Sequence, residues 1–297
     1  MNAHPEHEPR REGTPAYVEI ELVDDHSSAP TVVSSTPRRS VKVPVLLFLA
    51  TCFTTYAVGG AIYAFALMLI LTCHEFGHYF QALRYRVPAS LPYFIPVPMQ
   101  PLGTMGAVIS MRGNMGDRKA LFDIGISGPL AGLVPALFFS VLGLYWSSVG
   151  DIPPGHVSKL GDPLLFKFLV SQIFGPLPAH QDVFLHPLAY AGWVGVLITS
   201  LNLVPIGQLD GGHILYAILR RKAHWVASGL LAAAIVAVFV TQSYQWALML
   251  FLLILIGPNH PPTARDEMPL GWGRVVLGWL TLLFIIVGFT PQPFSNL

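Results

Sequence analysis

Apolar segments long enough to cross a bilayer limit what this chain of 297 residues can fold into. Hydrophobic residues make up 53% of the chain and charged residues only 11%, whereas a soluble domain carries roughly 25% charged residues. A chain of this composition cannot cover its surface with polar groups in water, which argues against a soluble enzyme and a disordered protein. The net charge of +1 argues against a nucleic-acid partner.

The apolar residues are grouped into segments that follow a polar N-terminal region. Several segments reach the roughly 20 residues that a membrane-spanning helix needs. We therefore expect an all-α polytopic membrane protein with about six or seven transmembrane helices. The segments are residues 43–58, 60–83, 120–147, 186–220, 223–241, 244–257 and 271–289.

Charged residues are concentrated in residues 1–42, where they alternate with Pro, Ser and Thr. This composition is typical of disorder, so we expect a disordered cytoplasmic tail at 1–42 and one membrane-embedded domain at 43–297. Lys and Arg at the end of the tail and in residues 84–119 indicate that both lie on the cytoplasmic side. We expect an integral multi-pass protein of the plasma or inner membrane, with its N-terminus in the cytoplasm.

The segment 84–119 contains too many prolines for a helix, because each proline removes a backbone donor and fixes φ. We expect a short extended or β ribbon at the membrane face. Such a ribbon could bind an unwound substrate by strand addition, or it could serve only in packing. The prolines are Pro88, Pro92, Pro96, Pro98 and Pro101.

The segment 186–220 is too long for one straight crossing and is interrupted by Asn202, Pro205 and Gly207. We expect one crossing with a break in its helix. Irregular backbone at membrane depth is tolerated only where it is buried in protein or lines a cavity. The break therefore predicts a functional site.

The motif His74-Glu75-Phe76-Gly77-His78 lies near the end of the second apolar segment. In a helix the two histidines lie one turn apart on the same face, where they can bind one Zn²⁺. Glu75 beside them has the position of a general base. Ionisable side chains within a membrane segment indicate function. The alternative is a group of buried polar residues that hydrogen-bond between helices.

A catalytic zinc site needs a third protein ligand. The extended metzincin motif does not supply it, because Gln81 and Arg84 stand where Gly and His would be. The remaining acidic residues in apolar surroundings are Asp123 and Asp210.

Depth in the membrane favours Asp210. His74 precedes Arg84 by ten residues, and Asp210 precedes Arg220 by ten residues, so both lie about 15 Å from the cytoplasmic face. Asp123 lies much closer to that face, next to basic residues at 118 and 119. The alternative for Asp210 is an ordinary Asp-Gly turn.

Together these residues resemble the site-2 protease family of intramembrane zinc metalloproteases, which carries the motifs H-E-x-x-H and N-x-x-P-x-x-x-x-D-G. The second motif is matched by Asn202, Pro205, Asp210 and Gly211. The stretch 122–132 is similar to the third core helix of the family, so the resemblance covers about residues 60–220. No segment has the length of a PDZ or CBS domain, which is typical of the compact branch.

The resemblance implies one zinc ion per chain, bound by His74, His78 and Asp210, with Glu75 as the catalytic base. It also implies that Asn202, Pro205 and Gly211 support the substrate carbonyl or its oxyanion. His213 and His260 stay open: His213 either supports Asp210 from behind or packs on a helix face, and His260 is either a loop residue or part of the active-site mouth.

The implied function is cleavage of transmembrane segments of membrane proteins inside the lipid bilayer, in regulated intramembrane proteolysis. Two alternatives are a catalytically inactive scaffold of the same fold and a metal transporter. A transporter needs a series of ligands along a pore, whereas the deep ligands in this sequence form one cluster.

Overall fold

The computed structural model describes residues 41–98, 101–111, 116–153 and 158–296. The predicted tail at 1–42 lies outside these residues except for its last two. The helices are α1 Lys42–Arg84, α2 Arg118–Tyr145, α3 Leu164–Phe174, α4 Pro187–Asn202, α5 Asp210–Leu219, α6 Lys222–Thr241, α7 Ala247–Ile256 and α8 Trp272–Gly288, with a 3₁₀ turn at Tyr244–Trp246. The strands are β1 Tyr93–Pro96, β2 Thr104–Val108, β3 Ser148–Asp151, β4 Ser158–Leu160, β5 Gln181–Phe184 and β6 Phe294–Asn296.

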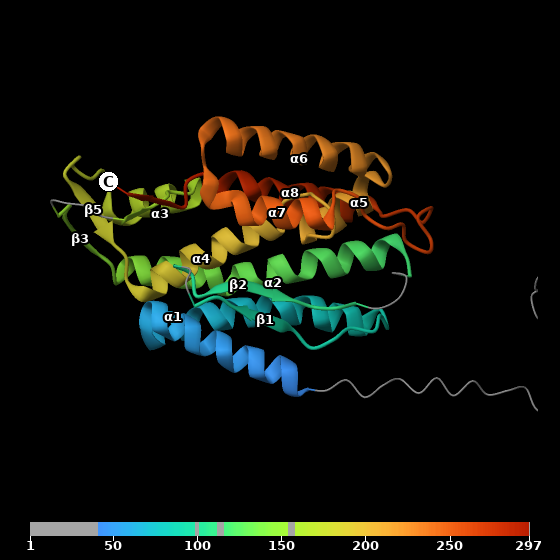
Figure 1. Ribbon diagram of the computed structural model, residues 1–297, viewed down its shortest axis with the longest axis horizontal. Coiled ribbons are helices and arrows are strands. Elements are labelled where there is room, and N and C mark those ends of the chain that lie inside the picture. The colour runs from blue at the N-terminus through green and yellow to red at the C-terminus, as the bar shows by residue number, and fades with distance from the viewer. Residues whose placement is uncertain (1–40, 99–100, 112–115, 154–157, 297) are drawn as a thin grey trace, which may run out of the picture. The chain divides into compact units, whose positions relative to one another are not determined.

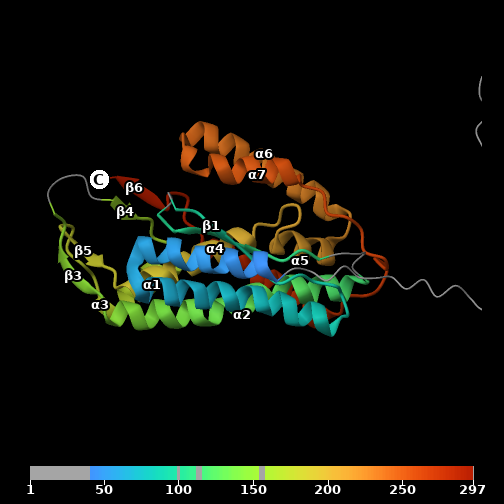
Figure 2. The same ribbon diagram turned by 60° about the horizontal axis from the view of Figure 1, so that its bottom comes forward.

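Helix α1 consists of two legs that meet at Gly60. Gly60 has φ 75° and ψ −174°, a backbone conformation that essentially only glycine adopts. The two legs, residues 42–59 and 61–84, lie side by side in blue and cyan in Figures 1 and 2. The separate apolar segments 43–58 and 60–83 of the sequence therefore correspond to two legs joined by a glycine turn.

Three helices of the described residues, α1, α2 and α6, are long and apolar enough to cross a membrane. Shorter apolar helices are α3, α7 and α8. Helix α6 is mostly exposed and presents Trp225 and Phe239 on its surface, as expected for a helix that faces lipid. The predicted helical membrane architecture is confirmed at this level, and the number of crossings stays a prediction.

Helices α1, α2 and α4 form the core, and small residues let them approach closely. A Cβ on Gly143 of α2 would collide with the backbone of Ala189 in α4, and a Cβ on Gly192 would collide with Ser140. The large side chains of Tyr63 and Trp193 are fully buried in this core. Trp193 satisfies its indole N–H by donating to the carbonyl of Gly161 at 2.9 Å.

The expected ribbon follows α1 and is confirmed as an antiparallel hairpin of β1 and β2, with Tyr93 opposite Val108. Its turn is tied to both legs of α1. The Thr54 hydroxyl donates to the carbonyl of Gly103 at 2.7 Å, and the Tyr63 hydroxyl donates to that of Leu102 at 2.8 Å. The hairpin therefore lies along α1, as Figure 1 shows.

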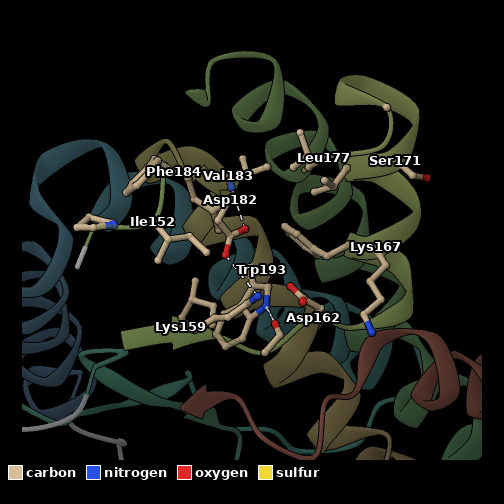
Figure 3. A pocket seen from close by; sticks show the side chains of 17 residues that line it. Ile152, Lys159, Asp162, Lys167, Ser171, Leu177, Asp182, Val183, Phe184 and Trp193 are labelled. Atoms are coloured by element: carbon tan, nitrogen blue, oxygen red, sulfur yellow. Dashed lines mark hydrogen bonds and ion pairs between the residues drawn. The ribbon is translucent and has the colours of Figure 1, made fainter. Parts of the chain in front are cut away.

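The region between α2 and α4 contains more β-structure than the sequence predicted. β3 pairs with β5, and β4 pairs with β6 from the end of the chain. Strands β4 and β5 and helix α3 line a cavity of about 420 Å³, in which Lys159 and Asp182 form an ion pair of 3.4 Å (Figure 3). The prediction of a single ribbon was incomplete, because these pairings join segments far apart in the sequence.

The segment 186–220 is broken as predicted. Helix α4 ends at Asn202, residues 203–209 form turns, and α5 begins at Asp210. A Cβ on Gly211 would collide with the carbonyl oxygen of Leu203, and one on Gly212 would collide with that of Gly207. The two glycines therefore let α5 start directly against the turn.

Candidate functional site

His74, Glu75 and His78 lie in the second leg of α1 and are all buried. The rings of His74 and His78 are one helical turn apart, with centroids separated by 5.0 Å at an angle of 70°. Their Nε2 atoms lie 3.3 Å apart. The motif thus presents two imidazole nitrogens at one point, as its i, i+4 spacing predicts.

Asp210, the first residue of α5, brings its carboxylate to the same point. Its Oδ2 lies 3.1 Å from His74 Nε2, and its Oδ1 lies 3.2 Å from His78 Nε2. Among the described residues these three form a group whose ligand atoms all lie within 4.8 Å of one another. Two imidazoles and one carboxylate make a donor set that suits zinc and leaves a coordination position for substrate.

One hydrogen bond fixes which nitrogen of His78 faces the other donors. Nδ1 of His78 lies 2.7 Å from the carbonyl oxygen of Ile124 in α2. A carbonyl oxygen can only accept, so Nδ1 carries the proton and the lone pair of neutral His78 lies on Nε2. Such a partner on the far nitrogen is the usual support of a histidine that binds a metal.

Helix α2 makes room for the histidines with a row of glycines. A Cβ on Gly128 would collide with Nε2 of His78, and a Cβ on Gly132 would lie 2.9 Å from Cβ of His74. A Cβ on Gly125 would lie 2.8 Å from Cβ of His213 in α5. The three glycines follow a helical spacing, so one face of α2 packs against the site from α1 to α5.

Of the other predicted site residues, Glu75 and Asn202 lie close to His74, whereas Pro205 lies in the turn between α4 and α5. Glu75 is 4% exposed, and its carboxylate has no hydrogen-bond or ion-pair partner among the residues the structure describes. Nδ2 of Asn202 lies 3.4 Å from His74 Nε2. Pro205 lies in the turn before α5, and Gly211 packs against Leu203.

Sequence reasoning missed the supporting groups of α2, namely the Ile124 carbonyl and the role of Gly128. The spacing of the glycines at 125, 128 and 132 is the signal that could have indicated a packed face. Asp123, which the depth comparison rejected as a ligand, is held elsewhere: Arg274 of α8 donates two hydrogen bonds of 2.8 Å to its carboxylate.

Comparisons with known proteins agree with this arrangement. The chain is similar to the probable zinc metalloprotease EGY1, chloroplastic, of Arabidopsis thaliana, at 30% identity over 236 residues, which are 77% of this chain and 42% of that protein. It is 32% identical to the rice (Oryza sativa subsp. japonica) protein of the same name over 237 residues, 75% of this chain and 39% of that protein. The chain thus spans less than half of the length of these relatives. No solved structure matches it.

The sequence profile of Peptidase family M50 matches residues 62–243. This range is more than half of the chain and contains the histidine motif, the row of glycines, the broken segment and Asp210. The chain therefore belongs to peptidase family M50, the zinc-dependent family of site-2 proteases that its two motifs resemble.

Proposed function

We propose that this chain is an intramembrane zinc metalloprotease that cleaves transmembrane segments of membrane proteins. The observation that carries the proposal is the convergence of His74, His78 and Asp210 within apolar helices, beside a Glu75 carboxylate that has no hydrogen-bond partner among the described residues. The relatives named as probable zinc metalloproteases support it.

We also propose how the chain sits in the membrane. The protease domain is residues 43–297, with its core at 60–220. The two legs of α1, then α2, the broken pair α4–α5, α6, α7 and α8 give seven crossings, which place the start of α8 on the cytoplasmic side, where Arg274 contacts Asp123. At ten residues α7 is only about 15 Å long, which is short for a crossing. The distribution of Lys and Arg supports a cytoplasmic N-terminus, and we propose a plasma or inner membrane as the location.

In this proposal the imidazoles of His74 and His78 and the carboxylate of Asp210 hold one zinc ion per chain. When bound there, zinc would supply a Lewis acid that polarises the scissile carbonyl. It would also lower the pKa of the attacking water, so that this water can lose a proton near neutral pH. The Ile124 carbonyl holds the His78 ring with its lone pair toward the site. The row of glycines in α2 keeps side chains out of the space that the imidazoles occupy.

Glu75 acts as general base and then as general acid. One of its carboxylate oxygens takes a proton from the attacking water, whose oxygen forms the new bond to the carbonyl carbon. When the C–N bond breaks, the same carboxyl gives the proton to the leaving amine nitrogen. Asn202 directs its amide N–H toward the substrate carbonyl oxygen and stabilises the charge that develops on it.

A substrate helix must unwind before cleavage, because its own hydrogen bonds shield its carbonyls. An extended substrate needs new partners for these backbone groups inside the membrane. Among the described residues neither strand of the β1–β2 hairpin pairs with a third strand, and we propose that one outer edge pairs with the unwound substrate.

Two alternatives are tested by the same variants. A catalytically inactive scaffold would hold zinc without turnover. A metal transporter would need further ligands along a path, and the described residues contain one group of three potential metal ligands.

Replacement of Glu75 by Gln should separate zinc binding from catalysis. We expect kcat to fall by about 10²- to 10⁴-fold, because the amide cannot take a proton, with the zinc content unchanged. Turnover of a model transmembrane substrate in detergent and elemental analysis measure the two quantities. The control Glu267→Gln alters an exposed glutamate and should keep full activity. A fully active Glu75→Gln variant would refute the role of general base.

Asn202→Ala tests stabilisation of the developing charge. We expect kcat to fall by about 10²- to 10³-fold with KM and zinc content close to wild type, since the interaction strengthens in the transition state. The matched control is Gln208→Ala, which removes an exposed amide from the following turn. If Asn202→Ala changes only KM, the side chain binds substrate without stabilising the transition state.

Gly128→Ala tests whether α2 must leave space for the His78 ring. The added methyl group would collide with Nε2 of His78, so we expect the zinc content of the purified protein to fall well below one per chain. Gly229→Ala in α6 is the control, because a Cβ there meets nothing within 4 Å. Equal zinc content in both variants would show that α2 does not confine the His78 ring.

Pro96→Ala and Pro98→Ala test the hairpin as the substrate-binding edge. Loss of the fixed φ makes the edge less preorganised, so we expect KM for cleavage to rise about threefold or more while zinc content stays unchanged. Pro178→Ala, outside the hairpin, serves as the control. Unchanged KM for every substrate tried would leave the hairpin with a packing role only.

A further inference from the structure

Helix α5, which carries Asp210, is too short to fix its own position. It has ten residues, and Gly211 and Gly212 follow directly after Asp210. An isolated helix of this length is unstable in water, and glycine weakens it further. The place of the Asp210 carboxylate therefore depends on what packs against α5.

The loop at 257–271, between α7 and α8, supplies such a contact through His260. Nε2 of His260 lies 2.7 Å from Nδ1 of His213, which is one turn after Asp210 in α5. The two rings meet edge to face, with centroids 4.9 Å apart. Both residues are buried, at 6% and 8% exposure. His213 in turn packs against Gly125 of α2, so its ring is held between the loop and the site.

The carbonyl oxygen of Pro261 determines which nitrogen donates in each of these hydrogen bonds. Nδ1 of His260 lies 2.6 Å from the carbonyl oxygen of Pro261, which can only accept. Nδ1 of His260 therefore donates, and burial lowers the pKa of His260 so that the ring is neutral. Its Nε2 is then an acceptor, and His213 must donate from Nδ1. A single pattern of donors satisfies the whole contact.

Other residues of the loop hold the same face of α5. The ring of Tyr216 stacks on that of His260 with centroids 4.6 Å apart, and its hydroxyl donates to Asp266 at 2.6 Å. The backbone N–H of Thr263 donates to the same carboxylate at 3.1 Å. Burial raises the pKa of Asp266, but the hydrogen bonds from Thr263 and Tyr216 outweigh it and keep the pKa below its usual value. The carboxylate thus stays ionised as an acceptor.

From these contacts we propose that His260 is a positioning residue of the zinc site: through His213 it fixes the first turn of α5 and thereby the carboxylate of Asp210. His260 itself makes no contact with His74 or His78 among the described interactions. The 257–271 loop thus positions a ligand of the zinc site through a residue that follows Asp210 by 50 positions. This inference rests on the proposed function, since it assumes that Asp210 holds zinc.

The test is the rate of zinc release from the full-length protein in detergent, measured with an excess of a chromogenic chelator. His260→Ala removes the acceptor, and we expect release to become tenfold faster or more, the usual cost of losing a support behind a metal ligand. His260→Gln places an amide oxygen near the position of Nε2, so release should return close to the wild-type rate. His180→Ala, which removes an exposed histidine, is the control and should release zinc at the wild-type rate.

His260→Asn covers the case in which His260→Ala fails to fold. The shorter Asn side chain keeps a polar group near the position of Nδ1 and lacks the acceptor for His213. The His260→Asn protein should therefore release zinc as fast as the His260→Ala protein. Faster release from Asn than from Gln, with equal helix content by circular dichroism, supports the positioning role. If wild type holds zinc and the Asn, Gln and wild-type proteins release it equally fast, this inference alone is wrong. If folded wild type holds no zinc, the proposed function is wrong as well.

Discussion

The contact of Asp210 with two histidines joins residues up to 136 positions apart and imposes conditions on three helices. The second leg of α1 must present His74 and His78 on one face. α2 must offer glycines where their rings lie, and α5 must begin at Asp210. The break at 203–209 meets the last condition, since a continuous helix from α4 would carry Asp210 about 12 Å beyond Asn202.

The low dielectric of the membrane makes this contact costly without a cation. The partly buried Asp210 carboxylate loses part of its hydration, and the Nε2 lone pair of neutral His78 that faces it cannot donate a hydrogen bond in compensation. A divalent cation bound among the three side chains would compensate for the carboxylate charge and use both lone pairs. Metal binding and the packing of α1, α2 and α5 are therefore coupled, because the same side chains serve both.

Much of this arrangement could be predicted from the sequence. The i, i+4 spacing of the histidines, the break in 186–220 and the depth of Asp210 depend only on helix geometry and on the cost of polar groups in lipid. The same comparison set Asp123 aside as a ligand, and the structure pairs its carboxylate with Arg274. The proline-rich segment after α1 was correctly predicted as a ribbon.

The rest depends on contacts between distant segments, which no local pattern encodes. The pairing of β4 with β6 joins parts of the chain more than 130 residues apart, and the cavity in Figure 3 is lined by residues from Ile152 to Trp193. The contact partner of His260 could not be predicted either, because the sequence of a proline-rich loop does not indicate which residue its histidine contacts. Its contact with His213 depends on the packing of the 257–271 loop against α5.

In the proposed site, α1 and α5 hold one zinc ion between them. The decisive measurement is zinc per chain, by elemental analysis of detergent-purified wild type, Asp210→Ala and Asp123→Asn. We expect about one zinc in wild type and in Asp123→Asn and little in Asp210→Ala. Folded wild type without zinc, or Asp210→Ala with a full complement, would contradict it.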